Sequence, residues 1–324
     1  MEPSTPRPAA PATDVTRVVI ASESRITESV MEELFVVRAR FLAADDSKEV
    51  HAAVLYASQW FVIWVEGPDD GVDAVLKRSA KDKRHAHLRI IHRIRGPRTL
   101  PERLTLASTQ GADRPFEFAR RIHAVENASP ALQPATIWRR LSAPWTLGDP
   151  SDISAPPCRR LAVMGSDENR AIDAVRRLAE RFRGQLVYQR FAGGQRHSRD
   201  VGGAYLDLPI PGRETRVHVI SRRALELRMV REPLEKSRSL ALLVGDRPGP
   251  AIELAESVAA LANRGASLPA IQVVAHSAEV GGSVGDLLRG VIRRALAPQV
   301  VHLGPSQVAD YLLSLTEIEP QACC

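Results

Sequence analysis

Apolar residues recur with two different periods in the first third of the chain. Short runs with the alternation of strands separate longer stretches with the 3.6-residue period of helices. The expected order is strand, helix, strand, strand, helix, strand, at residues 17–22, 28–43, 51–57, 60–67, 71–82 and 88–94. A βαββαβ order with a central hairpin predicts a mostly antiparallel, ferredoxin-like sheet backed by two helices.

A second set of strands and helices begins at residue 159. Strands are expected at 159–165, 184–191, 203–210, 215–221, 239–246, 269–277 and 299–304, and helices at 169–182, 250–264, 284–297 and 306–318. This alternation predicts an α/β fold with a largely parallel sheet covered on both faces. The fold class is therefore α+β for the first domain and α/β for the second.

The segment between these two systems is expected to be an extension and a linker. Residues 113–125 have a helical pattern, and 128–158 are rich in proline, with room for one short helix. The predicted organisation is a disordered leader, a first domain, a helical extension with its linker, a second domain and a tail. Their ranges are 1–16, 17–110, 111–158, 159–318 and 319–324.

Composition excludes several classes of protein. The 324 residues are 44% hydrophobic and carry a net charge of +6 that is spread along the chain, which does not favour a nucleic-acid-binding protein. No window approaches the roughly 18 apolar residues of a membrane span. The cysteines, Cys158, Cys323 and Cys324, suit neither a disulfide framework nor a metal site. We expect a cytoplasmic protein without a bound metal.

Two short motifs in the first domain have a characteristic spacing. A strand ends in Val65-Glu66-Gly67, and a turn with the sequence Asp82-Lys83-Arg84-His85 follows the next helix. Residues 17–110 thereby resemble the BLUF family of blue-light flavin photoreceptors. The resemblance implies a ferredoxin-like sheet with two helices and, in that family, a bound flavin.

The residues that touch the flavin in that family are changed here. The family's switch tyrosine corresponds to Ile20, its switch glutamine to Ile63, and its ring-binding asparagine to Asp45. Its later tryptophan and methionine correspond to Glu102 and Leu104. Because a buried flavin needs polar partners for its carbonyl and N–H groups, we expect no flavin cofactor.

The third strand also has an apolar outer face. Alternation places Trp60, Val62 and Trp64 opposite the two helices. Either the helix near 113–125 or the linker covers these side chains, or they form an interface in a homodimer.

The second domain begins with a strand, a glycine and a helix, which is the order of a phosphate-binding loop. Laid on a P-loop from Gly165, the sequence has Arg170 at the second glycine, Ala171 at the lysine and Ile172 at the Ser/Thr position. Lys236 is the single lysine after residue 150, so no lysine can serve a P-loop or a guanine-binding motif here.

The order of elements in this domain nevertheless resembles that of bacterial small Ras-like GTPases. Ser221–Leu225 corresponds to their glycine-containing switch, and Ala278 to their base-recognition aspartate. The resemblance implies a P-loop GTPase fold, while the changed motifs predict no GTP hydrolysis. We expect Asp167 and Glu168 to cap the helix rather than to face a phosphate.

The sequence thus predicts a noncatalytic bacterial signalling or scaffold protein that acts through protein–protein contacts, as a homodimer and without cofactors. One alternative is a nucleotide-responsive switch that holds GTP, GDP or another anion through Arg170, Arg222 and Arg223. A nucleic-acid-binding regulator is the third possibility.

Overall fold

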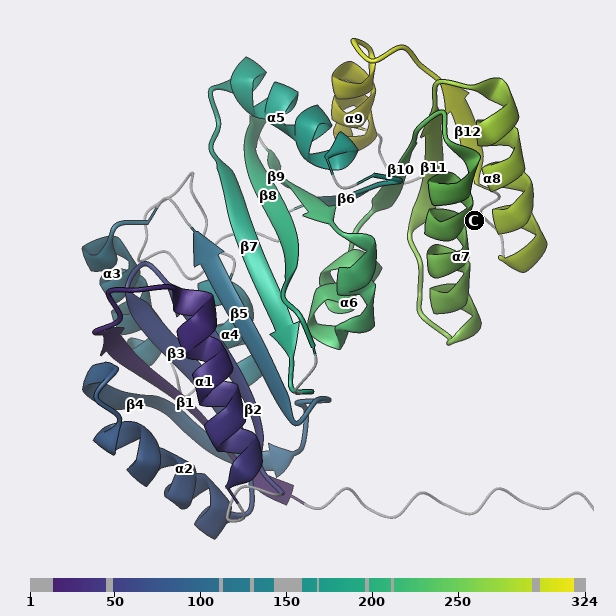
Figure 1. The fold of residues 1–324 in the computed structure, drawn as a ribbon. Coiled ribbons are helices and arrows are strands. Elements are labelled where there is room, and N and C mark those ends of the chain that lie inside the picture. Colours follow the sequence, from purple (N-terminus) through teal and green to yellow (C-terminus); the bar gives the residue numbers. More distant parts are fainter. Residues whose placement is uncertain are drawn as a thin grey trace, which may run out of the picture.

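The computed structural model describes residues 14–44, 49–110, 113–128, 131–142, 159–167, 169–195, 198–210, 213–292 and 298–317. The first part comprises β1 (Asp14–Ser24), α1 (Val30–Ala43), β2 (His51–Ala57), β3 (Trp60–Gly67), α2 (Asp69–Lys81), β4 (His85–Pro97), β5 (Leu104–Gln110), α3 (Pro115–Asn127) and α4 (Pro134–Ser142). We call this part the N-terminal lobe (Figure 1).

The second part, the C-terminal lobe, contains the remaining elements. They are β6 (Arg159–Gly165), α5 (Arg170–Phe182), β7 (Leu186–Gly193), β8 (Val201–Ile210), β9 (Arg213–Ile220), the 3-10 helix η3 (Arg222–Glu226), α6 (Arg228–Glu235), β10 (Ser239–Val244), α7 (Pro248–Asn263), β11 (Ala270–Ala275), α8 (Ala278–Val291), β12 (Gln299–His302) and α9 (Val308–Glu317). The helix α6 is not among the helices that the sequence predicts, and it contains Pro233, a residue that usually interrupts a helix.

The two lobes share one mixed sheet of twelve strands. Its order is β12-β11-β10-β6-β9-β8-β7-β5-β2-β3-β1-β4. The strands β1 to β4 pair antiparallel, whereas β9, β6, β10, β11 and β12 are mutually parallel. The sheet is thus mostly antiparallel in its first part and parallel later, as predicted, but β7, β8 and β9 of the second part pair antiparallel, which the prediction of a largely parallel sheet there did not include.

The strand β5 joins the two halves of this sheet, and the sequence did not predict it. It pairs parallel with β2, from Ala52↔Leu104 to Ala57↔Thr109, and antiparallel with β7 on its other side. Both neighbours bond to it through the backbone, so the lobes form one hydrogen-bonded layer rather than two sheets connected by a linker.

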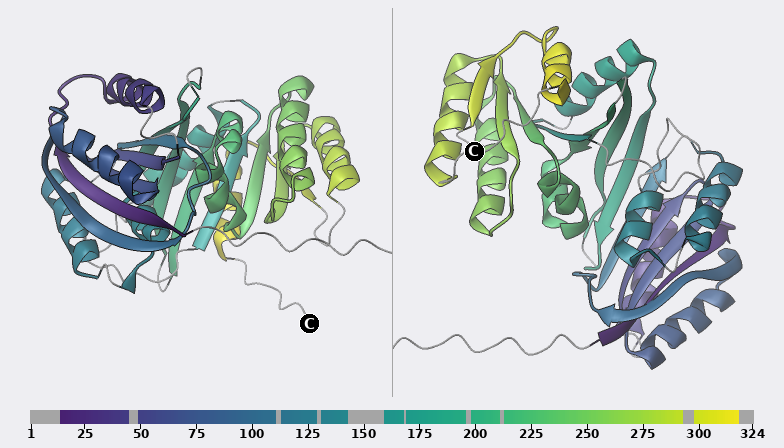
Figure 2. Two further views of the ribbon diagram at one scale, coloured as in Figure 1. Left: turned by 90° about the horizontal axis from the view of Figure 1, so that it is seen from below. Right: turned by 180° about the vertical axis from the view of Figure 1, so that it is seen from behind.

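The helices lie on both faces of the sheet. In the N-terminal lobe α1 and α2 cover one face, and α3 and α4 cover the other, which the view from behind shows (Figure 2). In the C-terminal lobe α5 and α9 pack on one face, and α6, α7 and α8 pack on the opposite face. No helix among the described residues is long and apolar enough to cross a membrane.

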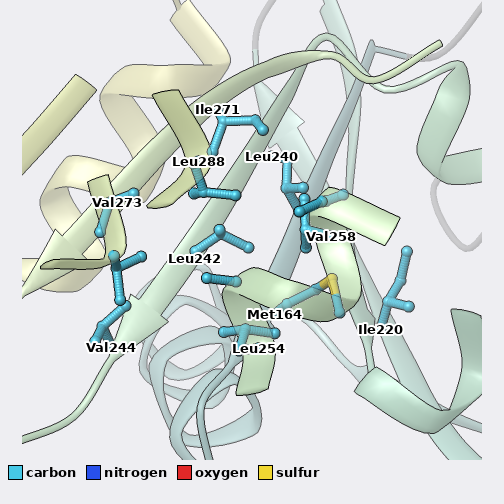
Figure 3. Close-up of a cluster of buried hydrophobic side chains, with 14 of the residues drawn as sticks. Met164, Ile220, Leu240, Leu242, Val244, Leu254, Val258, Ile271, Val273 and Leu288 are labelled. Carbon is cyan, nitrogen blue, oxygen red and sulfur yellow. The ribbon is translucent and has the colours of Figure 1, made fainter. Parts of the chain in front are cut away.

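The larger core of the C-terminal lobe lies beneath α7 and α8. Leu240, Leu242 and Val244 alternate along β10 toward these helices and contact Leu254 and Val258 of α7 (Figure 3). Since these strand residues are almost fully buried, the central strands of this lobe are held in one register.

The outer aromatic face of β3 is covered by the chain itself. Trp60, Val62 and Trp64 are at most 8% exposed. The Trp60 indole donates to the carbonyl of Pro115 at 3.2 Å, and the ring of Trp64 lies 6.4 Å from that of Trp138 on α4. Of the two covers predicted for this face, α3 and α4 therefore provide it, and these side chains are not available as a dimer interface.

A buried ion pair lies where the two lobes meet. Asp207 of β8 accepts from Nε and Nη2 of Arg216 on β9, at 2.5 and 2.8 Å, and the Arg216 guanidinium lies 4.1 Å from the centre of the Tyr205 ring. Burial raises the pKa of the Tyr205 hydroxyl. Arg121 of α3, paired with Asp113 at 3.4 Å, approaches the same group from the N-terminal lobe.

Candidate functional site

The turn between β6 and α5 is tightly built. A Cβ on Gly165 would lie 2.8 Å from the Asp167 carbonyl oxygen and 3.0 Å from the Ala171 nitrogen, so the backbone leaves no room for a side chain. The amide of Ser166 donates to Leu243 O at 3.0 Å, and Ser166 Oγ accepts from Gly245 N at 2.9 Å. The turn is thereby fixed against the end of β10.

Asp167 caps the start of α5, as the sequence predicts. Its Oδ1 accepts from the backbone N–H of Arg170 at 2.8 Å, and its Oδ2 lies 3.0 Å from Arg170 Nε. Partial burial acts to raise the pKa of Asp167, but the hydrogen bonds from Arg170 outweigh this and lower it. Glu168, predicted to share the capping role, lies outside the described residues.

Arg170 extends from this turn toward the end of β10, the neighbouring strand in the sheet. A Cβ on Gly245 would lie 2.8 Å from an Nη of Arg170, so the guanidinium rests directly on the glycine that follows β10. The neighbouring Ala171 is buried in the core, and Ile172 packs against it. At the P-loop positions the chain therefore has one paired arginine and two apolar side chains.

Two cavities flank the turn at the carboxyl ends of the parallel strands. The first, the β10 cavity, has a volume of about 400 Å³ and lies between α5, the ends of β10 and β11, and the segment before α9. The second, the β9 cavity, has a volume of about 420 Å³ and lies between the turn, the start of β8 and the end of β9. Volumes of this size are typical of sites for small molecules.

Their position follows from the topology of the sheet. The helix α5 after β6 lies on one face, whereas α7 after the neighbouring β10 lies on the other. Where successive helices leave on opposite faces, a crevice opens outside the carboxyl ends of the strands, and ligands bind there in open α/β sheets. Both cavities adjoin this crevice.

The β9 cavity is lined by polar groups of both charges. Arg222 pairs with Glu253, and Asp200 pairs with Arg190, so these charges are compensated. Within the described part of the chain, exposed Arg223 makes no hydrogen bond or ion pair, and the buried Ser221 Oγ has no hydrogen-bond partner. An arginine and a hydroxyl are thus available to a ligand that carries an anionic or other acceptor group.

The β10 cavity has both apolar and charged walls. Val244, Val274 and Leu303 form an apolar part of its lining, while Asp167, Arg170, Asp173, Arg177 and His276 add polar groups. The ring of His276 is bonded through Nδ1 to the carbonyl of Leu303, which holds it against the end of β12. The apolar part can contact a flat ring of a ligand, while the charged groups can pair with its polar substituents.

The positions that correspond to the flavin contacts of the N-terminal lobe are apolar. Ile20 of β1 and Ile63 of β3 are direct cross-strand neighbours, and both are buried in the cluster beneath α1 and α2 with Leu34 and Val72. Neither side chain can hydrogen-bond to the polar edge of an isoalloxazine, so these two residues do not fit that group. The third position, Asp45, lies outside the described residues.

Gln59 is not placed to replace the missing glutamine. It lies with Ser58 in the two-residue turn between β2 and β3, where both residues have a positive φ, of 63° and 48°. Such turns join adjacent strands of a hairpin. Gln59 is therefore not on the face of β3 that carries Ile63.

The two remaining positions of the family pattern have structural roles. Leu104 is fully buried at the start of β5. The carboxylate of Glu102 accepts from Thr105 Oγ1 at 2.8 Å and from the backbone N–H of Arg228, at the start of α6, at 2.9 Å. Glu102 thus links β5 to the C-terminal lobe.

The turn Asp82–His85 fastens α2 and β4 to α1. Arg84 binds the carboxylate of Asp82 and that of Glu33 on α1, the latter at 3.1 Å. His85 Nδ1 lies 2.7 Å from Ser22 Oγ on β1. Burial acts to raise the pKa of Asp82, but the hydrogen bonds from Arg84 outweigh it and lower the pKa from 3.8 to about 2.

This lowered pKa predicts an acid-dependent loss of stability. Because the carboxyl is more acidic in the folded chain, its contribution is present above about pH 4 and disappears as the pH falls through about 2. Urea unfolding measured across this range should therefore show a steeper loss for the wild type than for Asp82→Asn. Parallel curves for the two proteins would contradict this assignment.

Histidines do not form a metal site in the described ranges. His92 is buried, whereas His87 is exposed and pairs with Glu23. No group of three or more potential metal ligands occurs among the described residues.

Comparison with known proteins identifies the first part of the chain. Residues 15–99 match the family model described as "BLUF: Sensors of blue-light using FAD", so this segment is a BLUF domain. No curated protein matches the chain.

Several solved structures are similar to parts of the chain. The photo-activated state of BlsA has 15% identity, covering 40% of this chain and 92% of its own, with a TM-score of 0.28. BlrB, a BLUF protein in its dark state, has 19% identity, covering 44% and 95%, with a TM-score of 0.26.

A bacterial light-regulated adenylyl cyclase is also among these structures. It has 10% identity, covering 75% of this chain and 87% of its own, with a TM-score of 0.27. Since similar structures thus include an enzyme, the prediction that this chain is not an enzyme is wrong.

Proposed function

We propose that the chain is a signal-transduction protein whose C-terminal lobe binds a small anionic ligand of the nucleotide type at the turn between β6 and α5. In this proposal the lobe has a Ras-like fold, and arginine replaces the usual P-loop lysine. The observation that carries it is the pair of cavities of about 400 and 420 Å³ on either side of the Gly165 turn.

The chemistry of the two cavities supports a ligand with two unlike ends. Arg223 and Ser221 offer donors in the β9 cavity, while the apolar side chains of the β10 cavity accept a ring. Arginine binds phosphate oxygens with a planar fork of donors, so a lysine is not required. The carboxylate of Asp167 does not oppose such a ligand fully, because Arg170 neutralises it.

A thermal-shift titration of the full chain with GTP, GDP and ATP tests this function. A nucleotide present at a hundred times its Kd should stabilise the protein by about 2.7 kcal/mol. Arg223→Ala should weaken binding about tenfold, since a charge-assisted hydrogen bond contributes roughly 1.5–3 kcal/mol.

A matched control is available on α7. Arg264→Ala removes an exposed arginine that directly follows the C-terminal end of α7 and lines neither cavity, and this variant should bind nucleotide as the wild type does. An unchanged melting temperature of the wild type with GTP, GDP and ATP would contradict the proposal.

A second candidate is a scaffold that acts through protein–protein contacts. The observation that favours it is the apolar character of both ligand positions, Ile20 with Ile63 in one lobe and Ala171 with Ile172 in the other. If both folds keep their cores but have apolar side chains at the ligand positions, their function depends on the contacts that their surfaces make with other proteins. The absence of any nucleotide effect in the titration would favour this candidate.

A further inference from the structure

The connection between β7 and β8 forms part of a ligand cavity. The chain leaves β7 at Gly193, turns back, and enters β8 at Val201. Asp200, the last residue of this connection, and Val201, Gly202 and Gly203 at the start of β8 line the β9 cavity. The shape of that cavity therefore depends on how the connection is held.

A residue of the BLUF domain, in the N-terminal lobe, holds the connection between β7 and β8. Arg38 of α1 donates through Nη1 to the carbonyls of Gly193 and Ser198, at 3.2 and 2.7 Å. These acceptors lie on either side of the bend, so one guanidinium fixes both stems of the connection. The side chain is only 7% exposed and lies 4.5 Å from the centre of the Phe35 ring, which limits its freedom.

Further contacts hold the described residues on either side of positions 196–197. Ser198 Oγ accepts from Gly193 N at 3.0 Å, which closes the bend. A Cβ on Gly194 would lie 2.9 Å from the Leu104 carbonyl, so the backbone already touches the start of β5. Asp200 is held in turn by Arg190 of β7. The wall of the cavity thus has one arginine anchor in its own lobe and one in the BLUF domain.

The helix that carries Arg38 rests on the core of the BLUF domain. Met31 and Leu34 of α1 are buried in the cluster that contains Ile20 and Ile63. The same helix thus contacts this cluster on one side and, through the Arg38 guanidinium, the carbonyls of Gly193 and Ser198 on the other. The contact is continuous from the core of one lobe to the cavity of the other.

We propose that Arg38 is a positioning residue for the ligand site of the C-terminal lobe, which is complete only when α1 of the BLUF domain is docked. This inference rests on the proposed function, because it assigns a regulator to the same site. It makes α1 the element through which the state of the BLUF domain alters ligand affinity.

The test compares three variants in the full chain. Arg38→Ala removes the anchor, and Arg38→Lys keeps a charge and a donor. Arg40→Ala is the matched control, because Arg40 lies on the same helix but is exposed. Amide hydrogen exchange of residues 199–204 and the affinity for GTP are measured for each.

Arg38→Ala should raise the exchange rate at 199–204 about tenfold, as expected for the loss of hydrogen bonds that hold a local segment, and should weaken GTP binding by a similar factor. Exchange in β10 and β11 should not change. Arg38→Lys should lie between Arg38→Ala and the wild type, and Arg40→Ala should match the wild type.

Two results would overturn the inference: wild-type exchange at 199–204 in Arg38→Ala, or faster exchange throughout the molecule. Failure of the proposed function is distinguishable, because then the wild type itself does not bind GTP while the exchange experiment still decides the role of Arg38. If GTP binds equally to the wild type and to Arg38→Ala, the positioning role of Arg38 is contradicted, whereas the proposed nucleotide site is not.

Discussion

Replacing Asp207 with alanine is expected to lower the free energy of unfolding by about 3–5 kcal/mol. Its carboxylate is fully buried and receives two hydrogen bonds from Arg216, which is itself nearly buried. Removal of the acid deprives a guanidinium in the interior of two charge-assisted hydrogen bonds and of its nearest counter-charge, and this loss is the source of the effect.

Urea unfolding of the full chain measures this change. Asp310→Ala is the control, because Asp310 pairs with Arg181 on the surface, where both side chains are more than half exposed. Exposed pairs contribute roughly 0–1 kcal/mol, so the control should hardly shift the curve. Equal and small effects of the two substitutions would show that the buried pair does not stabilise the junction of the lobes.

Glu66→Ala is the second substitution with a large expected effect. The buried carboxylate of Glu66 accepts from the backbone N–H of Thr99 at 2.6 Å and of Leu100 at 2.7 Å, and also from Thr99 Oγ1 and the Trp64 indole. Alanine leaves these buried donors without an acceptor, at roughly 1–3 kcal/mol for each. We expect the free energy of unfolding to fall by about 3 kcal/mol or more.

The same unfolding assay tests this result against Glu256→Ala, which removes an exposed carboxylate on α7. The control should stay within about 0.5 kcal/mol of the wild type, as surface substitutions usually do. A loss below 1 kcal/mol for Glu66→Ala would mean that water or a shifted backbone satisfies the donors of residues 99 and 100.

Periodicity predicts most of the fold because both lobes keep regular apolar faces. The strands and helices expected after residue 159 are present, and the helix near 113–125 is α3. The strand β5 was not predicted because Leu104–Gln110 contains three Ser or Thr residues and has no clear alternation of apolar and polar positions. Its pairing with β7, some eighty residues later, is a long-range property that no local pattern reveals.

The candidate site was only partly foreseeable. The glycine at 165 and the capping acid at 167 follow from local turn and helix chemistry, and both are confirmed. The role of Arg38 could not be predicted, because an arginine on an amphipathic helix looks like any solvated charge until tertiary contacts bury it. The orphan hydroxyl of Ser221 is likewise a consequence of packing and not of sequence.

The unbroken sheet has a consequence for any attempt to divide the molecule. A cut between the lobes would strip β5 and β7 of each other and leave two long rows of unsatisfied backbone groups. Such rows are templates for pairing with foreign strands, and natural proteins guard against them. Each half alone would therefore be prone to aggregate, and the two lobes are better regarded as a single folding unit than as two independent domains.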